Sequence, residues 1–71
     1  MLYVLKIKGT KTIPDFVQIR DEQMILRAYF RLSQQKIGLK KNKLESETKG
    51  IMNLLDNIPY GKIHKYYSPH E

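Results

Sequence analysis

The chain has 71 residues, 41% of them hydrophobic, with no cysteine and a formal net charge of +6. A chain this short builds one hydrophobic core at most, and neither disulfides nor a thiolate metal site can stabilise it. No apolar run approaches the roughly 18 to 20 residues that span a bilayer, so we expect a cytoplasmic protein without a membrane contact. The excess of lysine and arginine favours an anionic partner, either nucleic acid or an acidic protein surface.

Two β-strands are expected at the N-terminus. Residues 2–8 are rich in β-branched, aromatic and aliphatic types, and Gly9 begins a turn-rich stretch after them. One face of this strand carries three large apolar side chains, and we expect that face to be buried: Tyr3, Leu5 and Ile7. Pro14 cannot donate to a sheet, so the second strand is expected at 16–20. Its inward-pointing residues would be Val17 and Ile19.

The segment 24–32 decides the fold, because two periodicities compete in it. With a period of two, alternate residues are apolar and predict a half-buried strand: Met24, Leu26, Ala28, Phe30 and Leu32. With a period of 3.6, another set predicts an amphipathic helix capped by Asp21: Met24, Ile25, Ala28, Tyr29 and Leu32. We favour the strand, because the helix would leave Leu26 and Phe30 outside its buried stripe.

Two helices and a last strand are expected in the second half. Ser33 can cap a short helix at 34–41. The main helix is expected at 46–58, where one face collects the apolar side chains Ile51, Met52, Leu54, Leu55 and Ile58. Residues 62–67 alternate weakly and predict an edge strand, and the tail 68–71 is expected to fray. The prediction is one α+β domain over 1–67, in which an antiparallel meander of about three strands packs against the helix at 46–58.

Motifs that carry catalytic or cofactor chemistry are missing. The histidines, His64 and His70, stand in a polar tail without cysteine and without a carboxylate at metal-ligand spacing. The serines stand in turn or cap contexts, and the dispersed glycines form no phosphate-binding loop. We therefore expect no metal, no cofactor and no catalytic residue, so the sequence favours a binding module over an enzyme.

Basic residues gather in two places. A run of lysines without an acid among them connects the predicted helices and could neutralise phosphates: Lys36, Lys40, Lys41 and Lys43. In the strand interpretation, the uncovered sheet face interleaves basic, polar and aromatic side chains: Lys6, Lys8, Phe16, Gln18, Arg20, Arg27, Tyr29 and Arg31. Surfaces of this kind bind single-stranded nucleic acid, because bases stack on the rings and cations follow the backbone.

Nucleic acid is the partner we expect from these two groups. The residues predicted to contact it are Lys6, Lys8, Arg27, Tyr29, Arg31, Lys36, Lys40, Lys41 and Lys43. Two alternatives stay open. The protein could be an accessory subunit or adaptor that docks on an acidic surface of a larger protein complex. An apolar patch of Phe16, Ile25 and Tyr29 could instead form the interface of a homodimer.

Overall fold

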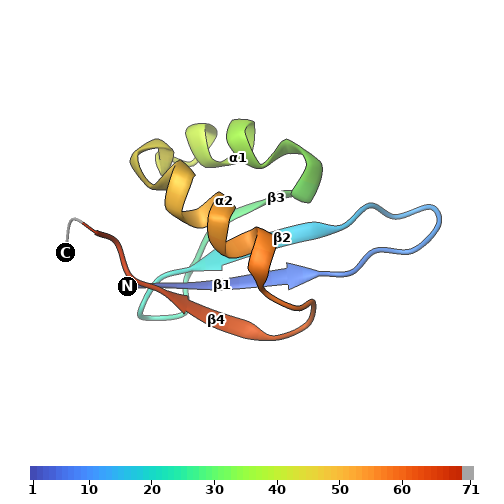
Figure 1. Ribbon diagram of the computed structural model, residues 1–71, viewed down its shortest axis with the longest axis horizontal. Helices are drawn as coiled ribbons and strands as arrows, with labels where there is room; N and C mark the ends of the chain where they lie inside the picture. The colour runs from blue at the N-terminus through green and yellow to red at the C-terminus, as the bar shows by residue number, and fades with distance from the viewer. Residues whose placement is uncertain (70–71) are drawn as a thin grey trace.

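The computed structural model describes residues 1–69 and shows a four-stranded antiparallel sheet with two helices on one side (Figure 1). The strands are β1 (Leu2–Ile7), β2 (Phe16–Arg20), β3 (Leu26–Arg31) and β4 (Ile63–Tyr66). Their order across the sheet is β3-β2-β1-β4, so β3 and β4 form its edges. Helices α1 (Gln35–Lys41) and α2 (Thr48–Asn57) follow the short 3-10 turns η1 (Leu32–Gln34) and η2 (Glu45–Glu47). The predicted α+β meander with a fourth edge strand is confirmed.

The ambiguous segment 24–32 forms a strand over Leu26–Arg31, as we favoured, but its buried alternation begins only at Ala28. Ala28 and Phe30 are buried, whereas Met24 and Leu26 are 44% and 45% exposed. The cause is a register shift between β2 and β3, which sets Arg20 opposite Leu26 and leaves Arg27 without a partner across the strands. Such a bulge reverses the side to which the following residues point. The expectation that Met24 and Leu26 lie in the core is therefore wrong.

The buried face of β1 is the opposite of the predicted one. Val4 is fully buried and Lys6 is only 8% exposed, whereas the residues expected inside are only partly buried: Tyr3, Leu5 and Ile7. Residues paired across antiparallel strands share a face, and β1 pairs Val4 with Ile19 and Lys6 with Val17. Since Val17 and Ile19 point inward as predicted, β1 must turn Val4 and Lys6 toward the helices. Apolar residues on both faces of β1 made the sequence pattern misleading here.

The core lies between this face and the two helices. It contains Val4, Val17, Ile19, Ala28, Phe30, Leu39, Ile51, Leu55, Ile58 and Tyr66. Helix α1 comes close to β3 because Gly38 has no side chain, and a Cβ there would overlap the Phe30 ring. This close approach sets the exposed side of α1 beside the end of β3.

The C-terminal strand β4 pairs with β1, and the chain at its end is bonded to η2, the turn that precedes α2. Tyr66 donates its hydroxyl to Glu47 Oε2 at 2.8 Å, and Ser68 donates to Glu47 Oε1 at 2.7 Å. The tail predicted to fray, 68–71, therefore begins with an anchored residue. Its last two residues, 70–71, lie outside the part of the chain that the structure describes.

Candidate nucleic-acid interface

A hollow of about 270 Å³ lies between the end of β3 and helix α1. It is lined by Phe16, Tyr29, Phe30, Arg31, Gln34, Ile37, Gly38, Lys41 and Asn42. The two groups that the sequence suggested separately, the basic and aromatic sheet face and the lysine run, meet here. We call this region the β3–α1 edge.

The Tyr29 ring is held in place by Phe16. The two ring centroids are 4.8 Å apart and the planes are inclined by 21°, so the rings are stacked. The pairing of β2 with β3 explains the contact, because both residues lie on the side of the sheet that faces away from the helices. Tyr29 is 52% exposed, which leaves ring surface open to solvent. A planar group can therefore stack on a ring whose orientation is already set.

Two cations, Arg31 and Lys41, line the same hollow as this aromatic pair, whereas Lys36, Lys40 and Lys43 lie outside it. Arg31 lies opposite Phe16 in the sheet, and Lys41 lies in the last turn of α1. Lys36, Lys40 and Lys43 are exposed on α1 and just after it. Within residues 1–69, none of these side chains has a carboxylate within salt-bridge distance. An anionic ligand would therefore meet no competing carboxylate here and would displace the solvent ions near these charges.

Two other predicted binding residues lie elsewhere. Arg27 stands in the β3 bulge, away from the hollow, and its Nη1 lies 3.7 Å from Asp21 Oδ2. Lys8 follows β1 at the base of the β1–β2 loop, with its Nζ 4.9 Å from the centre of the Tyr60 ring. Neither residue lines the β3–α1 edge.

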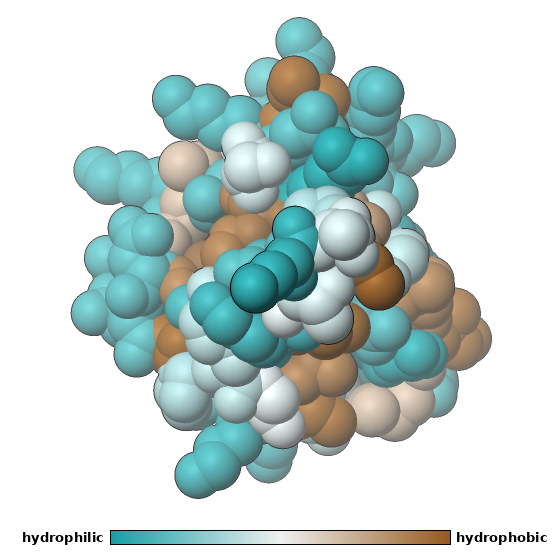
Figure 2. Space-filling view, turned by 90° about the vertical axis from the view of Figure 1, so that its right-hand side faces the viewer, coloured by the Kyte–Doolittle hydropathy of each residue, from teal (hydrophilic) through white to brown (hydrophobic). Residues whose placement is uncertain are grey.

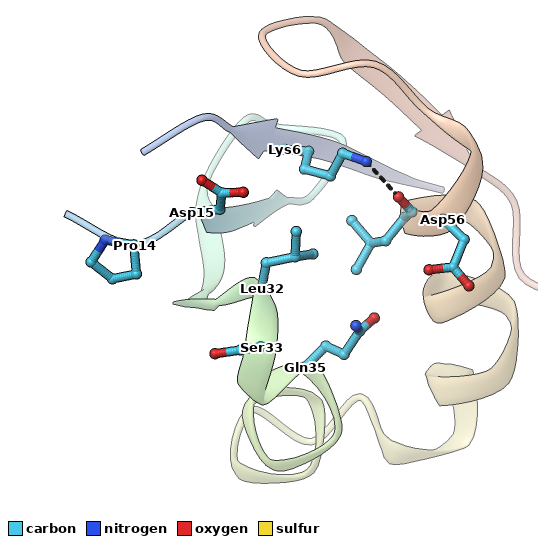
Figure 3. Close-up of a pocket in the computed structure, with 8 residues that line it drawn as sticks. Lys6, Pro14, Asp15, Leu32, Ser33, Gln35 and Asp56 are labelled. Carbon is cyan, nitrogen blue, oxygen red and sulfur yellow. Dashed lines mark hydrogen bonds between the residues drawn. The ribbon is translucent and has the colours of Figure 1, made fainter. Parts of the chain in front are cut away.

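Lys6 was predicted on the open face, and that placement is wrong. Its Nζ donates to the backbone oxygen of Leu55 at 2.7 Å (Figure 3) and lies 4.6 Å from the centre of the Tyr60 ring. The Leu55 carbonyl is among the last four of α2, which have no partner within the helix. A lysine there satisfies the carbonyl and neutralises the negative end of the helix dipole. Lys6 is therefore a cap for α2.

A cavity of about 490 Å³ beside Lys6 is bordered by the base of the β1–β2 loop (Figure 3). Asp15 Oδ1 accepts the Gly9 N–H at 2.7 Å, and Asp15 Oδ2 accepts the Tyr60 hydroxyl at 2.7 Å. These two hydrogen bonds, helped by the nearby Lys8 and Lys6 charges, lower the pKa of Asp15. The bond to Asp15 raises the pKa of Tyr60. These polar groups hold the loop in place.

Sequence reasoning missed Gln34 and Ile37, which also line the β3–α1 edge. The signal was present, because residues 34, 37 and 41 are spaced so that they share one face of a helix. Once Lys41 is taken as a binding residue, Ile37 and Gln34, which precede it at helical spacing, are expected on the same surface.

Comparison with protein families, with characterised proteins and with solved structures gives no match for this chain. Across residues 1–69, no helix combines the length and apolar character needed to cross a bilayer. The function must therefore be inferred from the residues and geometry described above.

Proposed function

We propose that this protein is a non-catalytic module that binds nucleic acid at the β3–α1 edge. The observation that carries the proposal is the half-exposed Tyr29 ring, backed by Phe16 and flanked by Arg31 and Lys41. A base can stack on the open ring surface while the two cations contact the neighbouring phosphates. A surface with both aromatic and basic groups binds nucleic acid more tightly than a surface with either group alone.

The remaining lysines of the run extend the positive surface. Lys36, Lys40 and Lys43 add charge along α1 and its C-terminal end without an acid between them. Such charges attract a polyanion whatever its sequence, so the binding we propose is strongly salt dependent. We propose that this binding takes place in the cytoplasm, the compartment expected from the sequence.

An adaptor role is the second candidate, because the side of the sheet away from the helices also carries apolar residues. Leu5 and Ile7 are partly exposed and Ile63 is 55% exposed. Nucleic acid does not need these side chains, whereas an acidic protein surface with apolar groups would contact them.

Fluorescence anisotropy with a labelled single-stranded oligonucleotide tests the proposal at about 50 mM salt. Tyr29→Leu should weaken binding by about 5-fold to 150-fold, since stacking contributes roughly 1–3 kcal/mol per base. Lys41→Gln should reduce the steepness of the salt dependence by about 0.7 in a plot of log K against log salt. Lys49→Gln is the matched control, because Lys49 is an exposed lysine of α2 outside this edge.

Three results would contradict the proposal. The first is no oligonucleotide binding even at low salt. The second is an equal effect of Lys41→Gln and Lys49→Gln, which would show that net charge alone matters. The third is polyglutamate binding as tight as oligonucleotide binding and insensitive to Tyr29→Leu, which would favour the adaptor.

A further inference from the structure

The face of the sheet that points away from α1 and α2 is not covered by another element of the described chain (Figure 1). We call it the open face, and its register places there Tyr3, Leu5, Ile7, Phe16, Gln18, Arg20, Leu26, Tyr29, Arg31, Ile63 and Lys65. None of the four described strands contains an aspartate or glutamate. Figure 2 views the molecule from the side of the β1–β2 loop, and at that end hydrophilic side chains stand among the apolar ones.

Tyr3 forms a second aromatic position on the open face, and the sequence did not predict it. Tyr3 lies directly opposite Arg20 on one neighbouring strand and directly opposite Lys65 on the other. Arg20 donates from Nη1 to the backbone oxygen of Met24 at 3.0 Å, which holds its guanidinium near the turn. A partly exposed ring thus stands between two cations, the same combination that is found around Tyr29.

We propose that the ligand is a single strand of nucleic acid that crosses the open face from the β3–α1 edge to β4. One base would contact Tyr29, a later base would contact Tyr3, and Arg20 and Lys65 would contact the backbone at the far end. This inference rests on the proposed function and adds both the strandedness of the ligand and its path.

The separation of the two rings supports a path over more than one nucleotide. Tyr29 lies two strands away from Tyr3 and is offset by two residues along the strand direction. With strands about 4.8 Å apart and about 3.4 Å per residue, the two backbone positions are roughly 12 Å apart. Bases within a duplex are stacked on each other and cannot reach such rings, whereas the bases of a single strand can be splayed out.

The charges on the open face argue against a second copy of the chain as the occupant. Two such faces packed together would bury Arg20, Arg31 and Lys65 of both copies in one interface, with no strand carboxylate to balance them. Like charges brought together in an interface cost free energy, so the face disfavours self-association and favours a polyanion.

The test measures binding of labelled twelve-nucleotide oligothymidylate, with a twelve-base-pair duplex as comparison. The single strand should bind at least about tenfold tighter than the duplex. Tyr3→Leu should weaken single-strand binding by at least about fivefold, while Tyr3→Phe, which keeps the ring, should retain it. Lys65→Gln should weaken binding more than Lys62→Gln, since Lys62 is an exposed lysine outside the strands. Circular dichroism confirms that each variant is folded, and Lys65→Gln changes only an exposed side chain.

The outcomes separate this inference from the proposed function. If Tyr29→Leu weakens binding but Tyr3→Leu and Lys65→Gln do not, the path across the sheet is wrong and the proposed function stands. Equal binding of duplex and single strand would also overturn the inference. If the wild-type protein binds no oligonucleotide, both proposals fail. A dimer in analytical ultracentrifugation that Lys65→Gln strengthens would assign the open face to a second copy.

Discussion

The two faces of the sheet carry similar residue types, but their cations have different environments. On the covered face, Lys6 is buried and bonded to the Leu55 carbonyl. On the open face, Arg31 and Lys65 have no carboxylate partner within residues 1–69. A buried cation that satisfies an internal acceptor stabilises the fold, whereas a solvent-accessible cation without a carboxylate partner can bind a ligand. The side of the strand, more than the residue type, decides the role.

The apolar residues of the two faces differ in the same way. Val4 and Ile19 are fully buried because α1 and α2 cover them, whereas Leu5 and Ile7 remain partly exposed. Stability should therefore depend on the covered face, and binding on the open one.

The largest expected effect compares two isoleucines. Ile51→Ala should lower the free energy of unfolding by about 2–5 kcal/mol, because Ile51 is fully buried and its loss leaves a cavity. Ile63→Ala on the open face should cost less than about 1 kcal/mol. Urea unfolding followed by circular dichroism measures both. Equal losses would mean that the open face is covered in solution.

The next effect distinguishes Lys6, which stabilises the fold, from Lys41, which we propose to contact the ligand. Lys6→Met should lower the free energy of unfolding by about 1–3 kcal/mol, because the Leu55 carbonyl loses its donor, and should leave the oligonucleotide affinity of the folded protein unchanged. Lys41→Met should do the opposite, with stability within about 0.5 kcal/mol of wild type and weaker binding. A folded Lys6→Met protein with weakened binding would contradict the assignment of Lys6 as a helix cap.

The smallest effect concerns the two hydrogen bonds that Asp15 accepts at the base of the β1–β2 loop, which we call the Asp15 clamp. Hydrogen bonds from the Gly9 N–H and the Tyr60 hydroxyl lower the pKa of Asp15 in the folded protein. Ionised Asp15 therefore stabilises the fold above its unfolded pKa of about 3.9, and this contribution is lost as the pH falls through the lower folded pKa. Asp15→Asn should show a shallower loss of stability in acid, measured by urea unfolding between about pH 5 and pH 2.

The same variant has an alkaline readout. The bond to Asp15 raises the pKa of Tyr60, so this interaction stabilises the fold below the usual tyrosine pKa of about 10 and is lost as the pH rises through the folded value. Asp15→Asn should lower the pKa of Tyr60, which NMR titration of the tyrosine ring signals would follow. An unchanged Tyr60 titration would mean that the clamp is not formed in solution.

Local patterns determined most of the elements. Alternation at Val17 and Ile19 was enough to place β2 and its inner face, and the stripe at Ile51 and Leu55 placed α2. These signals work because the side chains of one element repeat with its own backbone geometry. The lysine run was visible as a binding candidate from its charge pattern, and Tyr29 from the strand interpretation, although nothing in the sequence placed them side by side.

Contacts between elements decided the rest. Both faces of β1 are apolar enough to be buried, so only its pairing with β2 and the carbonyl at the end of α2 selected Val4 and Lys6 for the inside. The meeting of Tyr29 with Lys41 depends on Gly38 letting α1 approach β3. Periodicity assigns side chains to a face within one element. The neighbour of that face is set by packing between distant segments, which no local pattern records.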